Sequence, residues 1–155
     1  MKDKEDIEIR EIKKSDGKFI LEIRNDDSTR FVLHNSDQYT LDQFNSWYEN
    51  DSPYWLIASY RKLDFGYFRT CRTDSKDKIR IGMDIHPNFR GQGLARPSYL
   101  KLFDFLKNNN YKEVDLEVLE KNKIAHSLYL KLGFIETKKY VLENGLVSIV
   151  MRRDL

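Results

Sequence analysis

Cysteine and long apolar runs are scarce in this sequence, which excludes an internal disulfide and a membrane-spanning helix. The 155 residues include one cysteine, Cys71, so no internal disulfide can form and a reducing, cytoplasmic setting is expected. The chain begins with charged residues, which do not resemble a signal peptide. No stretch approaches the ~20 consecutive apolar residues of a membrane span, so we expect no membrane partner.

Net charge is also small. Lysine and arginine number 27 against 25 aspartates and glutamates, a balance of +2. A field this weak does not indicate a nucleic-acid partner. The three histidines, His34, His86 and His126, lie far apart in the sequence, and none has zinc-type spacing from Cys71, so we expect no metal. With 40% hydrophobic residues, the sequence predicts one globular domain over 1–155.

Apolar periodicity predicts the elements of the first half of the chain. In order, we expect a strand over 7–12, helices over 18–25 and 41–48, and antiparallel strands over 54–60 and 65–72. Thr40 is the expected N-cap of the second helix, because its hydroxyl can accept from a first-turn amide. A turn at 62–64 joins the two strands. The segment 28–38 has no clear pattern.

The second half alternates strands and helices. We expect a strand over 79–85, a helix ending near 108, a strand over 114–118, a helix that Asn122 caps, and a closing hairpin over 134–142 and 147–152. Strand, helix and strand within about 40 residues predict a right-handed crossover, so the strands at 79–85 and 114–118 should be parallel.

Proline is rare as well, and one of the three is placed unusually. Pro97 falls about one turn into the expected helix, where its missing N–H removes a hydrogen bond and its ring crowds a carbonyl. Either the helix begins later, or its first turn is distorted.

A glycine-rich run joins the strand at 79–85 to this helix. Its residues are Arg90, Gly91, Gln92, Gly93, Leu94 and Ala95. The first N–H groups of a helix have no partner within it and point to one place, which makes an anion site. Small residues at 91, 93 and 95 let phosphates approach the main chain closely. The run therefore predicts a phosphate-binding turn.

A second motif strengthens this interpretation. Its residues are Leu116, Glu117, Val118, Asn122, Ala125, Leu128, Tyr129, Lys131, Gly133 and Phe134. Together the two motifs resemble those of the GNAT superfamily of acyl-CoA N-acyltransferases. The resemblance covers nearly the whole chain. It implies a mixed, mostly antiparallel α/β sheet with a central pair of parallel, splayed strands, helices on both faces, and acetyl-CoA as co-substrate.

The resemblance also implies where the co-substrate lies. The pantetheine arm pairs with free backbone groups of Met83 and Ile85, and the N–H of Ile85 is the candidate donor to the thioester oxygen. Pyrophosphate lies on the loop formed by Arg90, Gly91, Gln92, Gly93, Leu94 and Ala95. Asn122 is both a helix cap and a cofactor contact.

Tyr129 matches the family's usual general acid, since a phenol can give a proton to the departing sulfur. The alternative is a buried tyrosine with a wet hydroxyl. Glu117 is the first candidate for the base that takes the amine's proton, and Asp84 is the second. Either could instead be a charged residue on a solvated strand face.

The acceptor depends on the N-terminal half. Arg24, Asn25 and Arg30 are similar to the Arg-Asn region of relatives that acetylate nucleotide-linked amino sugars, which makes them candidate substrate-binding residues. A surface salt bridge to Asp26 or Asp27 is the plain alternative for the arginines. A protein N-terminus, a polyamine, an aminoglycoside, or a catalytically silent acyl-CoA-binding module are the competing functions. A monomer and a homodimer remain equally open.

Overall fold

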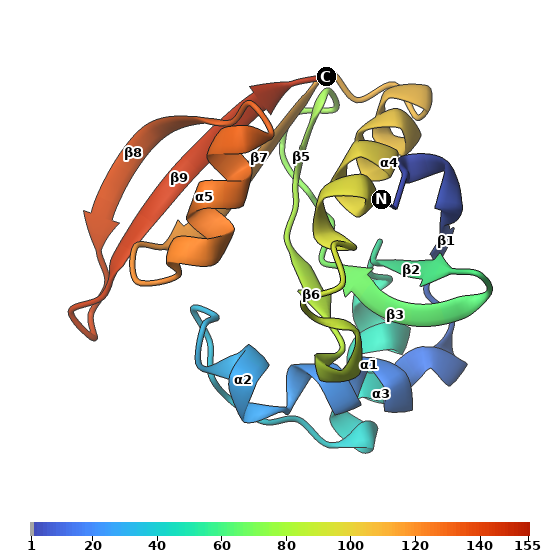
Figure 1. Cartoon of the computed structure of the whole chain (residues 1–155). Helices are drawn as coiled ribbons and strands as arrows, with labels where there is room; N and C mark the ends of the chain where they lie inside the picture. Colours follow the sequence, from blue (N-terminus) through green and yellow to red (C-terminus); the bar gives the residue numbers. More distant parts are fainter. Residues whose placement is uncertain (1) are drawn as a thin grey trace.

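The fold consists of two β-sheets that part in the middle of the molecule (Figure 1). The computed structural model describes residues 2–155. The first sheet is antiparallel, in the order β1 (Ile7–Glu11), β2 (Leu56–Tyr60), β3 (Leu63–Phe68) and β6 (Met83–Ile85). The second runs β4 (Cys71–Arg72), β5 (Lys78–Arg80), β7 (Glu113–Leu119), β9 (Val147–Asp154) and β8 (Ile135–Val141). The predicted parallel pair is confirmed as β5 with β7.

Helices lie on both faces of the first sheet. The helices of the molecule are α1 (Gly17–Arg24), α2 (Asp27–Arg30), α3 (Leu41–Asp51), α4 (Ala95–Asn108) and α5 (Lys123–Lys131). Neighbouring residues of a strand face opposite sides. On β2, Leu56 and Ala58 join the apolar cluster that contains Leu102 of α4, whereas Ile57 joins the cluster that contains Ile20 of α1. In Figure 1, α5 lies against the second sheet, while α1, α2 and α3 gather at the far end of the molecule.

The start of α3 is fixed by a capping box, as the sequence predicted for Thr40. The Thr40 hydroxyl accepts from the N–H of Gln43 at 3.2 Å, and the Gln43 side chain accepts from the N–H of Thr40 at 2.8 Å. The helix continues three residues beyond its predicted end at 48, to Asp51, and Ser52 then adopts a left-handed conformation.

The expected strand over 79–85 is divided between the two sheets. The N–H of Ile81 donates to Asp115 of β7 at 2.9 Å, but the carbonyl of Gly82 accepts from Arg69, just after β3, at 2.8 Å. The chain therefore changes partner between residues 81 and 82. A Cβ at Gly82 would lie 2.6 Å from the Arg69 guanidinium, so only glycine fits this crossing without displacing Arg69.

Two local expectations were wrong. The strand over 65–72 stops at Phe68, because Cys71 and Arg72 pair with β5 in the other sheet. The turn before it lies at Arg61 and Lys62, both with positive φ, and not at 62–64.

Pro97 does not disturb its helix. It is the third residue of α4, which begins at Ala95. The N–H groups of a first turn have no intrahelical acceptor, so proline loses nothing there. The lost hydrogen bond and the steric crowding expected from the sequence assumed that Pro97 lies deeper in the helix.

No helix in the described part of the chain is both long and apolar enough to cross a bilayer.

Replacing Thr40 by alanine should lower the free energy of unfolding by about 1 kcal/mol, because an orphan amide of α3 loses its acceptor. Thr40→Ser keeps the hydroxyl and should stay within a few tenths of a kcal/mol of the parent. Urea unfolding followed by circular dichroism measures both. Equal losses in the two variants would show that the threonine methyl group, and not the cap, carries the effect.

Candidate active site

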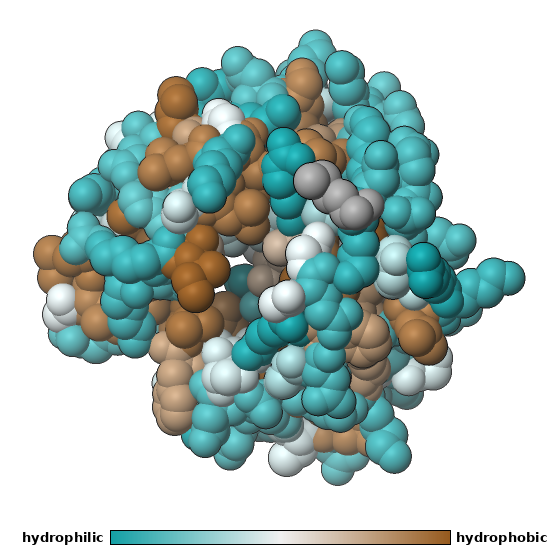
Figure 2. Space-filling model, viewed as in Figure 1, coloured by the Kyte–Doolittle hydropathy of each residue, from teal (hydrophilic) through white to brown (hydrophobic). Residues whose placement is uncertain are grey.

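The outer edge of β6 offers unpaired backbone groups where the two sheets part. Hydrogen-bonded pairs alternate along an antiparallel ladder. Arg69 donates to Gly82, and His86 donates to Phe65, so the even-numbered residues of this segment pair with β3. The N–H and C=O groups of Met83 and Ile85 therefore face the other way, into the gap between the sheets. The space-filling view is hollowed at this place, between α5 and β6 (Figure 2).

The glycine loop before α4 provides a cluster of donors. Gly91 and Gly93 have φ of 71° and 72°, and a Cβ at either would have no atom within 4 Å. Glycine is thus needed for the backbone conformation, and the space above the loop is open. Within residues 2–155, the N–H groups of residues 91–96 have no acceptor. Such a cradle fits a pyrophosphate, and Gln92, Leu94 and Ala95 would contribute through their backbone.

Arg90 is oriented differently from the sequence-based expectation. Its guanidinium donates to the carbonyl of Ile85 at 3.0 Å and to the hydroxyls of Ser28 and Thr29 at 2.5 and 2.6 Å. It therefore fastens the glycine loop to α2. Its contact with phosphate stays a prediction, and it would require some of these bonds to be exchanged.

Tyr129 of α5 is buried in the apolar cluster that also contains Tyr99 of α4. It is 7% exposed, and its hydroxyl is 3.0 Å from that of Tyr99 in α4. Burial raises the pKa of Tyr129 above its ordinary value, although the hydrogen bond from Tyr99 acts in the opposite direction. The phenol thus keeps its proton at neutral pH, as a general acid must. Asn122, the predicted cap of the same helix, accepts from the N–H of Ala125 at 3.4 Å.

Both carboxylates proposed as the base are already paired with arginines. Asp84, which is 7% exposed, accepts from Nε of Arg69 at 3.0 Å. Glu117 accepts from Arg80 at 3.2 Å and from the hydroxyl of Tyr140 at 2.9 Å. Their catalytic roles stay predictions.

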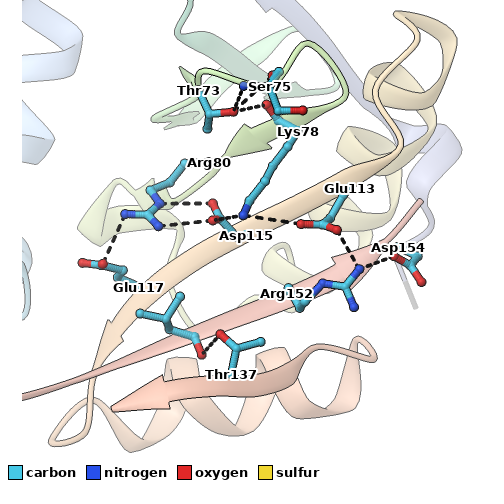
Figure 3. Close-up of polar contacts among 11 residues, drawn as sticks. Thr73, Ser75, Lys78, Arg80, Glu113, Asp115, Glu117, Thr137, Arg152 and Asp154 are labelled. Atoms are coloured by element: carbon cyan, nitrogen blue, oxygen red, sulfur yellow. Dashed lines mark hydrogen bonds and ion pairs between the residues drawn. The ribbon is translucent and has the colours of Figure 1, made fainter. Parts of the chain in front are cut away.

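Glu117 belongs to a ladder of charged side chains across β5, β7 and β9 (Figure 3). Buried Asp115 receives two bonds from Arg80, at 3.1 and 3.2 Å, and one ion pair from Lys78 at 3.2 Å. Because Arg80 also bonds Glu117, this bidentate pair fixes the orientation of the Glu117 carboxylate.

The structure contains a cavity of about 470 Å³. Its walls come from α1, the segment after α2, α3, and the residues before β2 and after β3. The lining residues are Ile20, Leu21, Arg24, Leu33, His34, Asn35, Tyr39, Gln43, Phe44, Trp47, Trp55 and Arg69. One of these lining residues, Arg69, pairs with Asp84 of β6 and so connects the cavity to that strand. No acidic side chain is among these lining residues.

The three predicted substrate-binding residues hold one loop, 33–39. Arg24 donates to the carbonyls of Asn35 and Asp37 at 2.5 and 3.1 Å. Asn25 exchanges two hydrogen bonds with the backbone of Tyr39, at 2.7 and 2.8 Å. Arg30 pairs with Asp27 at 3.0 Å, which is the salt bridge held as the alternative, and also donates to the backbone of Ser36. Of the three, only Arg24 lines the cavity.

Sequence reasoning missed Arg69, His34 and Tyr39. Arg69 left one signal, a lone arginine directly after the apolar strand that ends at Phe68. His34 lies in the segment 28–38, where no pattern could be assigned, and Tyr39 directly follows it, so no motif indicated a role for either.

Comparisons with known proteins agree with this geometry. A family model described as "Acetyltransferase (GNAT) family" matches residues 18–134. No curated protein matches the chain. The Salmonella typhimurium protein yncA, solved with its cofactor acetyl-CoA, is 21% identical, with a TM-score of 0.75 and coverage of 97% of this chain and 94% of that one.

Two further solved structures have the same fold. Spermidine N-acetyltransferase from Vibrio cholerae, in complex with CoA and spermine, is 18% identical, with a TM-score of 0.88 and coverage of 97% and 96%. Ribosomal-protein-alanine N-acetyltransferase from Brucella melitensis is 21% identical, with a TM-score of 0.78 and coverage of 96% and 99%.

The family model spans most of the chain. The chain belongs to the acetyltransferase (GNAT) family, the acyl-CoA-dependent N-acetyltransferases.

Proposed function

We propose that this acetyltransferase acylates the primary amine of an anionic small molecule, and that a nucleotide-linked amino sugar is the acceptor that best fits the cavity. One observation carries the proposal. Arg24 lines the cavity and is 8% exposed, yet within residues 2–155 its partners are two carbonyl oxygens and the ring of Tyr39, and no carboxylate pairs with it. A buried charge without a counter-ion is costly, and an anionic ligand would neutralise it.

The rest of the cavity favours a flat or apolar body on the same ligand. Trp47 and Trp55 meet edge to face at 4.9 Å between ring centroids, and Trp55 stacks on Tyr67 at 5.2 Å. Such aromatic walls suit stacking with a nucleobase or a sugar ring. A volume of about 470 Å³ lies within the usual range of small-molecule sites.

A polyamine fits this cavity less well. Spermidine carries several positive charges, and Arg24 and Arg69 would repel them where no lining side chain is acidic. The name of the Vibrio cholerae neighbour therefore does not supply the acceptor here. A protein N-terminus has no fixed anion for Arg24 to bind.

The residues of the gap have assignable parts in the transfer. Acetyl-CoA supplies the acetyl group as a thioester. The loop at 91–96 would hold its pyrophosphate, and the N–H of Ile85 would donate to the thioester oxygen. Tyr129 would supply the proton that the departing sulfur takes. Glu117 or Asp84 would receive the amine's proton, directly or through another group.

A glycine pair tests the loop. Gly93 and Gly145 have φ of 72° and 82°, and a Cβ at either has open space around it. Alanine should therefore cause similar backbone strain at both sites. Gly93→Ala should weaken CoA binding by roughly tenfold or more, about 1.4 kcal/mol, because its methyl group stands where phosphate approaches. Gly145→Ala, in the β8–β9 turn, should bind CoA like the parent. Calorimetry that finds equal CoA affinity in both variants would remove the loop from the site.

Tyr129→Phe keeps the aromatic ring and removes the hydroxyl group that would supply the proton. CoA affinity should hold while kcat falls by roughly 10²-fold or more. Tyr111→Phe, which removes a hydroxyl outside the gap, is the matched control for turnover. Release of free thiol, followed with a thiol reagent, gives both rates, and an unchanged kcat in Tyr129→Phe would show that water protonates the sulfur.

The acceptor is tested with Arg24→Gln against Arg30→Gln, since Arg30 is paired with Asp27 and does not line the cavity. With a UDP-linked amino sugar, Arg24→Gln should raise the acceptor KM by ~tenfold or more and leave that of acetyl-CoA unchanged, whereas Arg30→Gln should change it less. The same panel includes a TDP-linked amino sugar, spermidine and a peptide with N-terminal alanine. Better turnover of spermidine or the peptide would contradict the anionic acceptor and leave the acetyltransferase activity standing.

A further inference from the structure

The cavity has one side chain that can take a proton near neutral pH. Apart from Arg24, Arg69 and the phenol of Tyr39, the only titratable group among its described lining residues is His34. Neither Glu117 nor Asp84 is part of this lining. Among the side chains that line the cavity, His34 is therefore the one suited to accept a proton from an amine at neutral pH.

His34 is held from across the molecule. It lies in the segment after α2, yet its Nε2 is 2.8 Å from the hydroxyl of Ser148 in β9, which is fully buried. The same nitrogen is 3.7 Å from Oε2 of Glu117 in β7. The other ring nitrogen, Nδ1, has no partner within residues 2–155. An Nε2–H directed at Ser148 and Glu117 leaves the lone pair on Nδ1 available to a ligand.

The charges around His34 come from several elements. Glu117 of β7 favours the imidazolium, whereas Arg69 after β3 and Arg80 of β5 disfavour it. Burial is the largest influence, and it lowers the pKa of His34 below the ordinary value of 6.5. The ring is thus neutral at pH 7 and ready to accept a proton. Its side chain is 32% exposed, so the proton can later leave to solvent.

We infer that His34 is the proton acceptor for the amine, with Glu117 as the residue that positions the ring and stabilises its charged form. This rests on the proposed function, because it needs an amine in the cavity. In this pair the Glu117 carboxylate orients the His34 ring and stays ionised, while the imidazole gains and loses the proton.

The transfer balances in the following way. The nitrogen lone pair forms the C–N bond, and the electron pair of the C–S bond goes to sulfur. One N–H proton moves to His34, and the phenol proton of Tyr129 moves to sulfur. Transfer of the proton from the imidazolium to the phenolate through water restores both residues, so the net change is one proton moved from nitrogen to sulfur.

The dependence of kcat/KM on pH separates this role from a structural one. An amine must lose its own proton, with a pKa above 7, and His34 must be neutral, with a pKa below 6.5. In the parent, log kcat/KM for a UDP-linked amino sugar should therefore fall with slope 1 below the first pKa and with slope 2 below the second. His34→Gln should lose roughly 10²-fold in rate and keep slope 1 throughout. His126→Gln is the control, because His126 pairs with Glu136 at 2.7 Å away from the cavity.

Glu117→Gln sharpens the test. Since the Glu117 carboxylate raises the pKa of His34, its removal should move the second limb to lower pH. A slope of 2 that survives in His34→Gln, or a Glu117→Gln enzyme that loses most of its activity while the second limb stays at the same pH, would overturn the inference and make Glu117 itself the base.

An NMR titration of the imidazole signals keeps the inference testable without turnover. The signal missing from His34→Gln should titrate below 6.5 in the parent and lower still in Glu117→Gln. A pKa at or above 6.5, or one that Glu117→Gln leaves in place, counts against His34. Failure of every amine in the panel would instead count against the proposed acceptor, and CoA binding by His34→Gln confirms that the variant is folded.

Discussion

The chain passes from one sheet to the other at two neighbouring places, and the rest of the site depends on how these two passages are held together. The chain leaves the first sheet after Phe68 and returns to it after Ile81, and the two crossings are joined by the bond from the N–H of Arg69 to the carbonyl of Gly82. This bond keeps β3 and β6 together while β6 separates from β7. The backbone groups of β6 that turn away from β3 have no strand partner within residues 2–155, and apart from the carbonyl of Ile85, which accepts from Arg90, they are free to bind a ligand.

Charge is arranged differently on the two sides of the crossing. On the second sheet, Lys78 and Arg80 of β5 pair with acidic side chains of β7, and Arg152 of β9 pairs with Glu113, so the ion pairs link three strands (Figure 3). Beside the first sheet, Asp84 compensates Arg69, but Arg24 of α1 has two carbonyl oxygens and the ring of Tyr39 as partners and pairs with no carboxylate within residues 2–155. The fold thus satisfies its charges in the sheet and leaves one cation incompletely neutralised in the cavity. That asymmetry is typical of a binding site, where a ligand supplies the missing charge.

What could be predicted from the sequence is what short-range chemistry determines. The Thr40 cap and the glycine loop depend on residues a few positions apart. The parallel pair depends on a strand–helix–strand crossover, which is almost always right-handed. The partners of Arg90, Arg24 and His34 could not be predicted in the same way. Arg90 meets Ser28 across 62 residues, and His34 meets Ser148 across 114. A side chain's partner at such separation is decided by how the sheets pack, and no local pattern records it. The split of the 79–85 strand was missed for the same reason, since its apolar alternation continues unbroken through the change of partner.

The way in which loop 33–39 is fastened bears on how this enzyme can change over evolution. Arg24, Asn25 and Arg30 hold the loop by its main-chain oxygens and amides at residues 35, 36, 37 and 39. Every amino acid offers that carbonyl, so the side chains of the loop can be exchanged while the wall that they form keeps its position. New acceptors can then be sampled by point substitution at loop positions other than His34, with the acetyl-transfer machinery and the stability of the core left intact. The side chains of the loop can thus change the choice of acceptor while its backbone keeps the same position.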